Sequence, residues 1–512
     1  MPVNCSVDKG WNDLFIWATM AFSISTYLGI DLGTTTLKCI ITDHKQRVVG
    51  LTEVKLPIAR PQPLWSEQNP KDWWAGLQKA CKILRFKHRN EWSRISAIGL
   101  SGQMHGAVAL DAAGEVLRPA ILWNDGRAWL EAADLNKKVP TIGQIAGITA
   151  VAGFTAPKLL WLQAHEPKIF KRLAMLLAPK DFLRFKMSNA FITDPCDASG
   201  MLLLDVGQRK WSPVLMEACG IELENLPRID EGLKASAQLS KSAAHLLGLP
   251  SGLPIAAGAG DAAASAIGIG AIHDGDGFIS LGTSAQYFVT TKNFRPRPEQ
   301  MIQAPCHGLP DLWYQVAALL NGAGPLNWLS EILQGGNIQN LLQRTQRRYR
   351  GPGRILFLPY LSGERTPHND PHARAAFHGL HAGTTPEDLA LAVLEGVALS
   401  LADCQDVLEQ SGTRVAELLV VGGGTRSRFW VQLIANVLKR RITICKGAEL
   451  GAAFGAARLA RLAVSGEAPA EVCSKPKPLM RLEPDPALSK AYADRLGDFR
   501  ALYGALKGIG NV

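Results

Sequence analysis

Several motifs that mark common nucleotide and metal sites are missing from this 512-residue sequence. No G-x-x-x-x-G-K-[ST] segment occurs, which excludes a Walker-type nucleotide site, and no G-x-G-x-x-G follows a strand in Rossmann context. The nine cysteines form no C-x-x-C pair and have no metal-ligand spacing, so we expect reduced thiols in a cytoplasmic protein. The composition, with 47% hydrophobic and 20% charged residues, is that of an ordinary globular chain.

The N-terminal segment contains no pattern that predicts a membrane anchor. Its apolar run, residues 14–22, is too short to span a bilayer, and no basic stretch precedes it as in a secretory signal. We therefore expect no membrane partner. We expect residues 1–25 to be a dispensable N-terminal extension, with Met20 as the working start and the first strand beginning at about Thr26.

The length of the chain predicts two domains. A chain of 512 residues exceeds the size at which a single core stops growing, so domains of roughly 200 to 250 residues are expected. Turn residues gather at 271–277, which favours a boundary there. The predicted domains are residues 26–272 and 273–512.

The formal net charge of +10 raises the question of a nucleic-acid partner. The basic residues are scattered, however, and the densest cluster, at 344–350, is short. We interpret this cluster as a solvated helix end and expect no nucleic-acid partner. A basic balance suits anionic small-molecule substrates equally well.

What the sequence does contain is one unusual pattern in two copies. Residues 27–38 and 278–288 each run from a strand-like segment through Leu-Gly-Thr-Thr/Ser into a second strand-like segment. The bends at Gly33 and Gly282 let backbone amides approach an anion without a Cβ in the way. Hydroxyls add donors to each bend, at Thr34, Thr35, Thr283 and Ser284. Two hairpins a domain length apart suggest a duplicated fold that closes on one polyphosphate, with Asp31 available to hold its metal ion.

The remaining chain alternates helix-like and strand-like stretches, as an α/β protein should. Asn69 and the proline after it predict a helix start, with the helix running to about Leu84. Residues 95–101 are typical of a buried strand that ends in the loop 102–106, where α/β proteins place ligands. A second capping pattern starts at Thr385.

The last of these strands, residues 417–421, leads into three consecutive glycines at 422–424. A tight turn explains such a run as well as a nucleotide-binding loop does, so this segment only supports the hairpins. 

Taken together, the segments resemble the FGGY family of carbohydrate kinases. The two hairpins and the GGG loop are similar to the phosphate and adenosine elements of the sugar-kinase, heat-shock-protein-70 and actin superfamily. Residues 153–162 (GFTAPKLLWL) resemble the first FGGY signature, and three further segments are similar to the xylulokinase branch: QMHG at 103–106, ILWNDGR at 121–127 and LPYLSGERTP at 358–367. The resemblance implies an α/β fold of two ribonuclease H-like/actin-like ATPase domains with a cleft between them.

The implied reaction is transfer of the ATP γ-phosphoryl group to D-xylulose, giving D-xylulose 5-phosphate. The family's general base falls on Asp261, where a carboxylate at a strand end can accept the sugar proton; without the family, a helix N-cap would explain this residue equally well. Asp31 is the implied Mg²⁺ ligand. The sugar-contacting residues implied are Met104, His105, Trp123, Asn124, Asp125 and Arg127. Those implied for the nucleotide are Gly33, Thr34, Thr35, Lys38, Gly282, Thr283, Ser284, Gly422, Gly423 and Gly424.

One residue departs from the xylulokinase pattern. Ala262 stands where those enzymes usually carry Asn beside the catalytic Asp, and a lost polar contact to a substrate hydroxyl typically weakens discrimination by about 1 kcal/mol. Another ketose or polyol, such as ribulose, a fuculose-type sugar or gluconate, therefore stays open as the substrate. A non-catalytic sensor that binds sugar and nucleotide is the alternative of a different class. Expected partners are the sugar and ATP with Mg²⁺, and a homodimer stays open.

Overall fold

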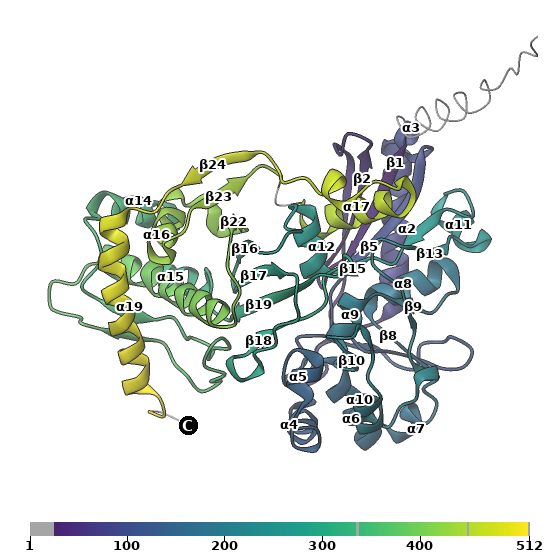
Figure 1. The fold of residues 1–512 in the computed structure, drawn as a ribbon, viewed down its shortest axis with the longest axis horizontal. Coiled ribbons are helices and arrows are strands. Elements are labelled where there is room, and N and C mark those ends of the chain that lie inside the picture. The colour runs from purple at the N-terminus through teal and green to yellow at the C-terminus, as the bar shows by residue number, and fades with distance from the viewer. Residues whose placement is uncertain (1–24, 334–336, 448–449, 510–512) are drawn as a thin grey trace, which may run out of the picture.

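Two seven-stranded sheets form the framework of the protein, one from each half of the chain (Figure 1). The structure, a computed structural model, describes residues 25–333, 337–447 and 450–509, so the expected extension at 1–25 lies almost entirely outside the described residues. The first sheet has the order β13 (Ala235–Gln238), β14 (Pro254–Ala256), β5 (Ile95–Gly102), β1 (Thr26–Leu32), β2 (Thr36–Asp43) and β3 (Val48–Lys55), with β15 (Ala259–Gly260) paired to the end of β5.

The second sheet repeats the pairing pattern of the first. Its order is β18 (Ile302–Gln303), β19 (Trp313–Leu319), β17 (Ala285–Thr291), β16 (Asp276–Leu281), β22 (Glu417–Val421), β23 (Ile442–Cys445) and β24 (Pro478–Leu482). In each sheet an antiparallel hairpin, β1/β2 or β16/β17, lies beside a parallel strand, β5 or β22. The two predicted hairpins and the duplicated α/β fold are thus confirmed.

Local sequence signals set the helix starts. Helix α2 (Pro70–Lys87) begins after Asn69, whose side chain accepts a hydrogen bond from the Lys71 amide at 3.0 Å, and it runs three residues past the predicted end. Helix α15 (Pro386–Gln410) begins with a capping box between Thr385 and Asp388. Both N-caps satisfy amides that have no partner within the helix.

Two helices meet between the sheets and position the candidate base. Helix α12 (Asp261–Gly268) packs against α17 (Gly451–Ser465), and α17 also packs on β1 and β5 (Figure 1). This close packing needs glycine: a Cβ on Gly455 would lie 1.8 Å from the Ala264 carbonyl oxygen, and one on Gly99 would lie 1.8 Å from that of Ala456. A helix from the second predicted domain therefore covers the sheet of the first.

The other helices surround the two sheets. Those in the first half are α3 (Arg89–Trp92), α4 (Trp129–Lys138), α5 (Ile142–Ala146), α6 (Thr155–His165), α7 (Pro167–Phe170), α8 (Pro179–Ser188), α9 (Pro195–Gly200), α10 (Pro213–Cys219) and α11 (Lys241–Leu247). Those in the second half are α13 (Gly324–Ile332), α14 (Ile338–Arg348), α16 (Arg428–Leu438), α18 (Pro469–Val472) and α19 (Pro486–Leu506). None of the helices in the described ranges is long and apolar enough to cross a membrane.

Two composition-based predictions are also confirmed. The basic cluster at 344–350 covers the end of α14, where Arg344 and Arg348 pair with Glu387 on the surface. The eight cysteines of the described residues are all free and buried, as expected of thiols that fill the core.

Candidate active site

Three pockets form the candidate site: two are lined from both halves of the chain, and the third is lined from the second half alone. The indole pocket, about 430 Å³, is lined by Met104, His105 and Trp123 among others. The Asp31 pocket, about 360 Å³, is lined by Asp31 and Lys38 on one side and by Ser280 and Gly422 on the other. The Trp430 pocket, about 700 Å³, is lined by Trp430 and by the residues that come directly after Ser280 and Gly422 in the chain: Leu281, Gly282, Thr283, Gly423 and Gly424.

Asp261 belongs to both the indole pocket and the Asp31 pocket. It is the first residue of α12, and the N-cap is Gly260, so the N-cap explanation of Asp261 is wrong. Its Oδ1 accepts a hydrogen bond from the Ala262 amide at 2.8 Å. Burial, reinforced by the charge of Asp31, raises the pKa of Asp261 to about 7. A carboxylate with this pKa can take a proton from a ligand in one pocket while facing an anion in the other.

Asp31 and Lys38 come from the first hairpin, where they are register partners on β1 and β2. Burial raises the pKa of Asp31 to about 6, although the nearby charge of Lys38 opposes the shift. The Asp31 Oδ1 is buried and has no hydrogen-bond partner among the described residues. The Lys38 Nζ lies 3.1 Å from the half-exposed Glu53, a pairing weak enough to exchange for a ligand.

The two hairpin bends differ in where they place their residues. Gly282 and Thr283 line the Trp430 pocket, whereas Ser284 is exposed and lines none of the three. The residues of the first bend, Gly33, Thr34 and Thr35, also line none of the three. The Thr34 hydroxyl instead bonds Gln103 and Trp123.

Met104 and His105 form one wall of the indole pocket. Nδ1 of His105 lies 2.9 Å from the Gly200 carbonyl oxygen, which can only accept, so Nδ1 carries the hydrogen and Nε2 keeps its lone pair. The ring packs on Phe154 with 4.0 Å between centroids, and burial lowers the pKa of His105 to about 3. His105 is thus a neutral hydrogen-bond acceptor with a fixed tautomer.

Some residues of the segment 123–127 line the indole pocket, and others hold the segment in place. Trp123, 42% exposed, and Asn124 line the indole pocket. Asp125 also reaches it, but its oxygens accept hydrogen bonds from the Ser66 amide and from Arg127. Arg127 itself does not line the pocket: it pairs with Glu67 at 2.7 Å and lies 3.6 Å over the Trp65 ring.

Two residues that line the indole pocket and one that supports its walls were missed by the sequence reasoning. Lys158 is fully buried, and its Nζ donates to the carbonyl oxygens of His105 and Gly153, both at 2.7 Å, so it ties two walls of the indole pocket together. Arg365 and Gln286 line the same pocket from the second half of the chain. The signal was present for all three, since Lys158, Gln286 and Arg365 lie within segments singled out from the sequence, 153–162, 278–288 and 358–367, although they had been given no roles.

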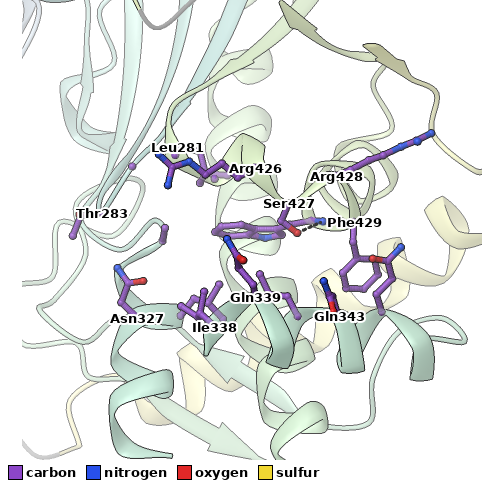
Figure 2. Close-up of a pocket in the computed structure, with 18 residues that line it drawn as sticks. Leu281, Thr283, Asn327, Ile338, Gln339, Gln343, Arg426, Ser427, Arg428 and Phe429 are labelled. Atoms are coloured by element: carbon purple, nitrogen blue, oxygen red, sulfur yellow. Dashed lines mark hydrogen bonds between the residues drawn. The ribbon is translucent and has the colours of Figure 1, made fainter. Parts of the chain in front are cut away.

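The Trp430 pocket has the composition of a site for a planar base. Figure 2 shows Gln339 and Gln343 of α14, with Asn327 of α13, directed toward the space beneath Arg426 and Ser427. Gly424 must be small here, because a Cβ would lie 2.4 Å from the Leu281 side chain. An apolar cavity with a few amide groups suits an aromatic ring with polar edges.

Comparison with known proteins places the chain in a family. The family model described as "FGGY family of carbohydrate kinases, N-terminal domain" matches residues 26–268, and the model of the C-terminal domain of the same family matches residues 277–464. The xylulose kinase of Escherichia coli K12 is 41% identical over 478 residues, which is 93% of this chain and 98% of that protein.

Solved structures agree with this placement. The structure of a protein described as a xyloylose kinase from Brucella ovis superposes with a TM-score of 0.92 at 42% identity, covering 94% of this chain and all of that one. A gluconate kinase from Lactobacillus acidophilus superposes with a TM-score of 0.89 at 25% identity over 95% of this chain and 99% of its own. The fold is therefore that of the sugar kinases, and the chain belongs to the FGGY family of carbohydrate kinases.

Proposed function

We propose that this protein transfers the γ-phosphoryl group of ATP to D-xylulose, giving D-xylulose 5-phosphate. The observation that carries the proposal is the position of Asp261, whose carboxylate lines both the indole pocket and the Asp31 pocket. The xylulose kinase of Escherichia coli, 41% identical over nearly its whole length, supports the choice of sugar.

In this proposal the sugar and ATP bind in different pockets. The sugar binds in the indole pocket, where the His105 Nε2 accepts a hydrogen bond from a sugar hydroxyl and Trp123 and Asn124 contact the sugar. The adenosine occupies the Trp430 pocket, and its phosphates lead through Gly282, Thr283 and Gly422 to Lys38. Asp261 accepts the proton of the attacking hydroxyl, so the γ-phosphorus gains a bond to the sugar oxygen as its bond to the ADP oxygen breaks.

Asp31 fits the role of a Mg²⁺ ligand. Its Oδ1 is buried without a partner, and an ionised carboxylate oxygen is the ligand type that Mg²⁺ prefers. A bound Mg²⁺ would neutralise phosphate charge during transfer. Because a cation there would also offset the charge of Asp31, the pKa of Asp261 would fall when it binds.

The choice of sugar depends on groups beside Asp261. Ala262 presents no polar group, whereas Gln286 and Gln303 bring amides to the indole pocket from the second sheet. These amides offer a substitute for the missing asparagine. A different ketose or polyol, including ribulose, a fuculose-type sugar or gluconate, is the second candidate because of this rearrangement.

Two coarser assignments accompany the reaction. We propose that residues 26–272 bind the sugar and phosphates and residues 273–512 the nucleotide, with the exception that Gln286, Gln303 and Arg365 reach the sugar from the second range. We also propose a cytoplasmic location, since all eight described cysteines are free thiols and ATP is the phosphoryl donor.

The test is ADP release from MgATP with D-xylulose, measured beside D-ribulose, L-ribulose, glycerol and gluconate. The expected result is a strong preference for D-xylulose, with sugar phosphate formed in equal amount to ADP. A preference for another sugar would keep the kinase mechanism and replace the substrate. No sugar-dependent release at all would favour a non-catalytic sensor.

A further inference from the structure

The bend of the first hairpin is joined to the indole pocket by a chain of side-chain hydrogen bonds. Nε1 of Trp123 lies 2.9 Å from the Thr34 hydroxyl, and that hydroxyl lies 3.0 Å from Oε1 of Gln103. Nε2 of Gln103 lies 3.0 Å from Oε1 of Gln68, which also accepts a bond from the Trp73 indole at 3.0 Å.

The direction of every bond in this chain is determined. An indole nitrogen only donates, so the atom of Gln68 that faces Trp73 is its oxygen, and Gln68 Nε2 donates to the carbonyl oxygens of Thr34 and Pro57 at 2.7 and 3.0 Å. Gln103 then donates to Gln68 through Nε2 and accepts from Thr34 through Oε1. The single hydroxyl hydrogen of Thr34 is therefore given to Gln103, while its lone pair accepts the Trp123 hydrogen.

These hydrogen-bond directions bear on whether Thr34 can donate to a phosphate. A hydroxyl whose hydrogen already goes to Gln103 has none left to donate to a phosphate oxygen. We propose that Trp123, Thr34 and Gln103 form a positioning linkage that couples sugar binding in the indole pocket to the first hairpin, and that Thr34 is not a phosphate-binding donor. The inference rests on the proposed function, because it takes the indole pocket as the sugar site.

The linkage is buried at its Gln103 end and exposed at its Trp123 end. Gln68 and Gln103 are 2% and 1% exposed, and buried amides are costly to leave unpaired, so they hold their positions. Gln103 also donates its backbone amide to the Leu32 carbonyl at 2.8 Å, which fixes the end of β1 next to Asp31. Trp123 is 42% exposed and is the member that a sugar can contact. A ligand packed on the indole thus acts on the hairpin through Thr34.

The experiment combines Thr34→Val, Trp123→Phe and the double variant. Valine keeps the shape of threonine without the hydroxyl, and phenylalanine keeps a ring without the N–H. Thr34→Ser, which retains the hydroxyl, is the rescue variant, and Trp129→Phe, at an exposed indole outside the pockets, is the matched control. The KM for sugar, the KM for ATP and kcat are measured for each, together with the affinity for a non-hydrolysable ATP analogue.

We expect each single variant to lower kcat/KM for the sugar by about fivefold, through both a higher KM and a lower kcat, because each breaks the bond between Trp123 and Thr34. The ATP-analogue affinity stays unchanged, the double variant is no worse than either single one, and Thr34→Ser restores the wild-type values. A phosphate-donating Thr34 gives the opposite pattern: weaker analogue binding, unchanged KM for sugar, and multiplicative losses in the double variant. That pattern would overturn the linkage.

Failure of the proposed function is distinguishable from failure of the linkage. If another sugar drives ADP release, the same parameters are measured with that sugar. If none does, the proposed function fails, and the analogue affinity of Thr34→Val still decides the question: weakened binding overturns the linkage, and unchanged binding supports it.

Discussion

Two groups of buried carboxylates lie in the first half of the fold, and only one belongs to the candidate active site. Asp31 and Asp261 line the Asp31 pocket, where Lys38 on the neighbouring strand is the nearby cation. Asp181 of α8, Asp194 at the N-cap of α9 and Asp197 of α9 surround the Nζ of Lys180 at 2.5, 2.6 and 3.1 Å. None of the three lines the indole, Asp31 or Trp430 pocket.

The comparison shows that neither burial nor a shifted pKa marks a functional carboxylate by itself. Burial raises the pKa of Asp194 as it raises that of Asp261, although Lys180 opposes the shift at Asp194. Burial alone would lower the pKa of Lys180, but the three carboxylates raise it. Asp181, Asp194 and Asp197 are also close enough together to hold a metal ion, yet the lysine ammonium takes that place. What distinguishes the site pair is access to a pocket.

The largest expected effect separates the two groups by activity. Asp261→Asn removes the proton acceptor but keeps the shape of the side chain, so sugar-dependent turnover should fall by about 10²- to 10⁴-fold. Asp194→Asn should cause a far smaller loss of turnover per folded molecule, because this carboxylate faces Lys180 and no pocket. Both are measured as ADP release at saturating MgATP and sugar.

Circular dichroism of both variants is the control for folding. An Asp261→Asn enzyme that keeps full turnover would remove Asp261 from the role of general base and, with it, the distinction between the two groups.

The second prediction concerns the stability of the fold. Lys180→Met leaves three buried carboxylates without their cation, and breaking a buried ion pair on one side costs about 3–5 kcal/mol of unfolding free energy. Lys186→Met, at an exposed lysine on the same helix, should stay within about 0.5 kcal/mol of wild type. Urea unfolding measures both. Equal stabilities of the two variants would mean that the cluster does not hold α8 and α9 together.

The sequence predicted the elements with strong local signals. The hairpins, the N-caps at Asn69 and Thr385, and Asp261 at a strand end all depend on residues within one short segment, and each was found. The position of the Thr34 hydroxyl could not be predicted, because it depends on Gln103 and Trp123, which are remote in sequence.

The same limit explains why Arg127 does not line the indole pocket. Arg127 was expected at the sugar, but its partner Glu67 and the Trp65 ring lie in another segment and hold it behind the pocket. The packing of α17 on the first sheet likewise depends on Gly29 and Gly99, more than 350 residues away along the chain, by the numbering of the sequence. Long-range contacts of this kind leave no local pattern to read.

A third prediction concerns the sugar preference set by the residue beside Asp261. Ala262→Asn places an amide next to Asp261 in the indole pocket, and a hydrogen bond to a sugar hydroxyl is worth about 1 kcal/mol, or about fivefold. The kcat/KM for D-xylulose relative to D-ribulose should rise by that factor. Gln286→Ala tests the converse, since it removes the amide that substitutes for the missing asparagine. Unchanged ratios in both variants would show that neither position selects the sugar.

The last prediction concerns the pH dependence of stability. Asp261 has a folded-state pKa of about 7, above its ordinary value of 3.8, so the folded protein holds a proton that the unfolded chain has released between these pH values. Ionising this buried group therefore destabilises the fold progressively as pH rises toward 7. Asp261→Asn cannot ionise, so its Tm should exceed that of wild type at pH 8, by about 2–4 °C for each 1 kcal/mol, and the difference should shrink at pH 4.5.

Melting curves in EDTA measure this difference without a divalent cation at Asp31. The comparison is Asp194→Asn, whose carboxyl pKa is raised as well, so its Tm difference should change with pH in the same direction, offset by the loss of a partner of Lys180. A Tm difference for Asp261→Asn that does not change between pH 4.5 and 8 would mean that Asp261 ionises in the folded protein as readily as in the unfolded chain. The two groups of carboxylates would then differ only in their access to a pocket.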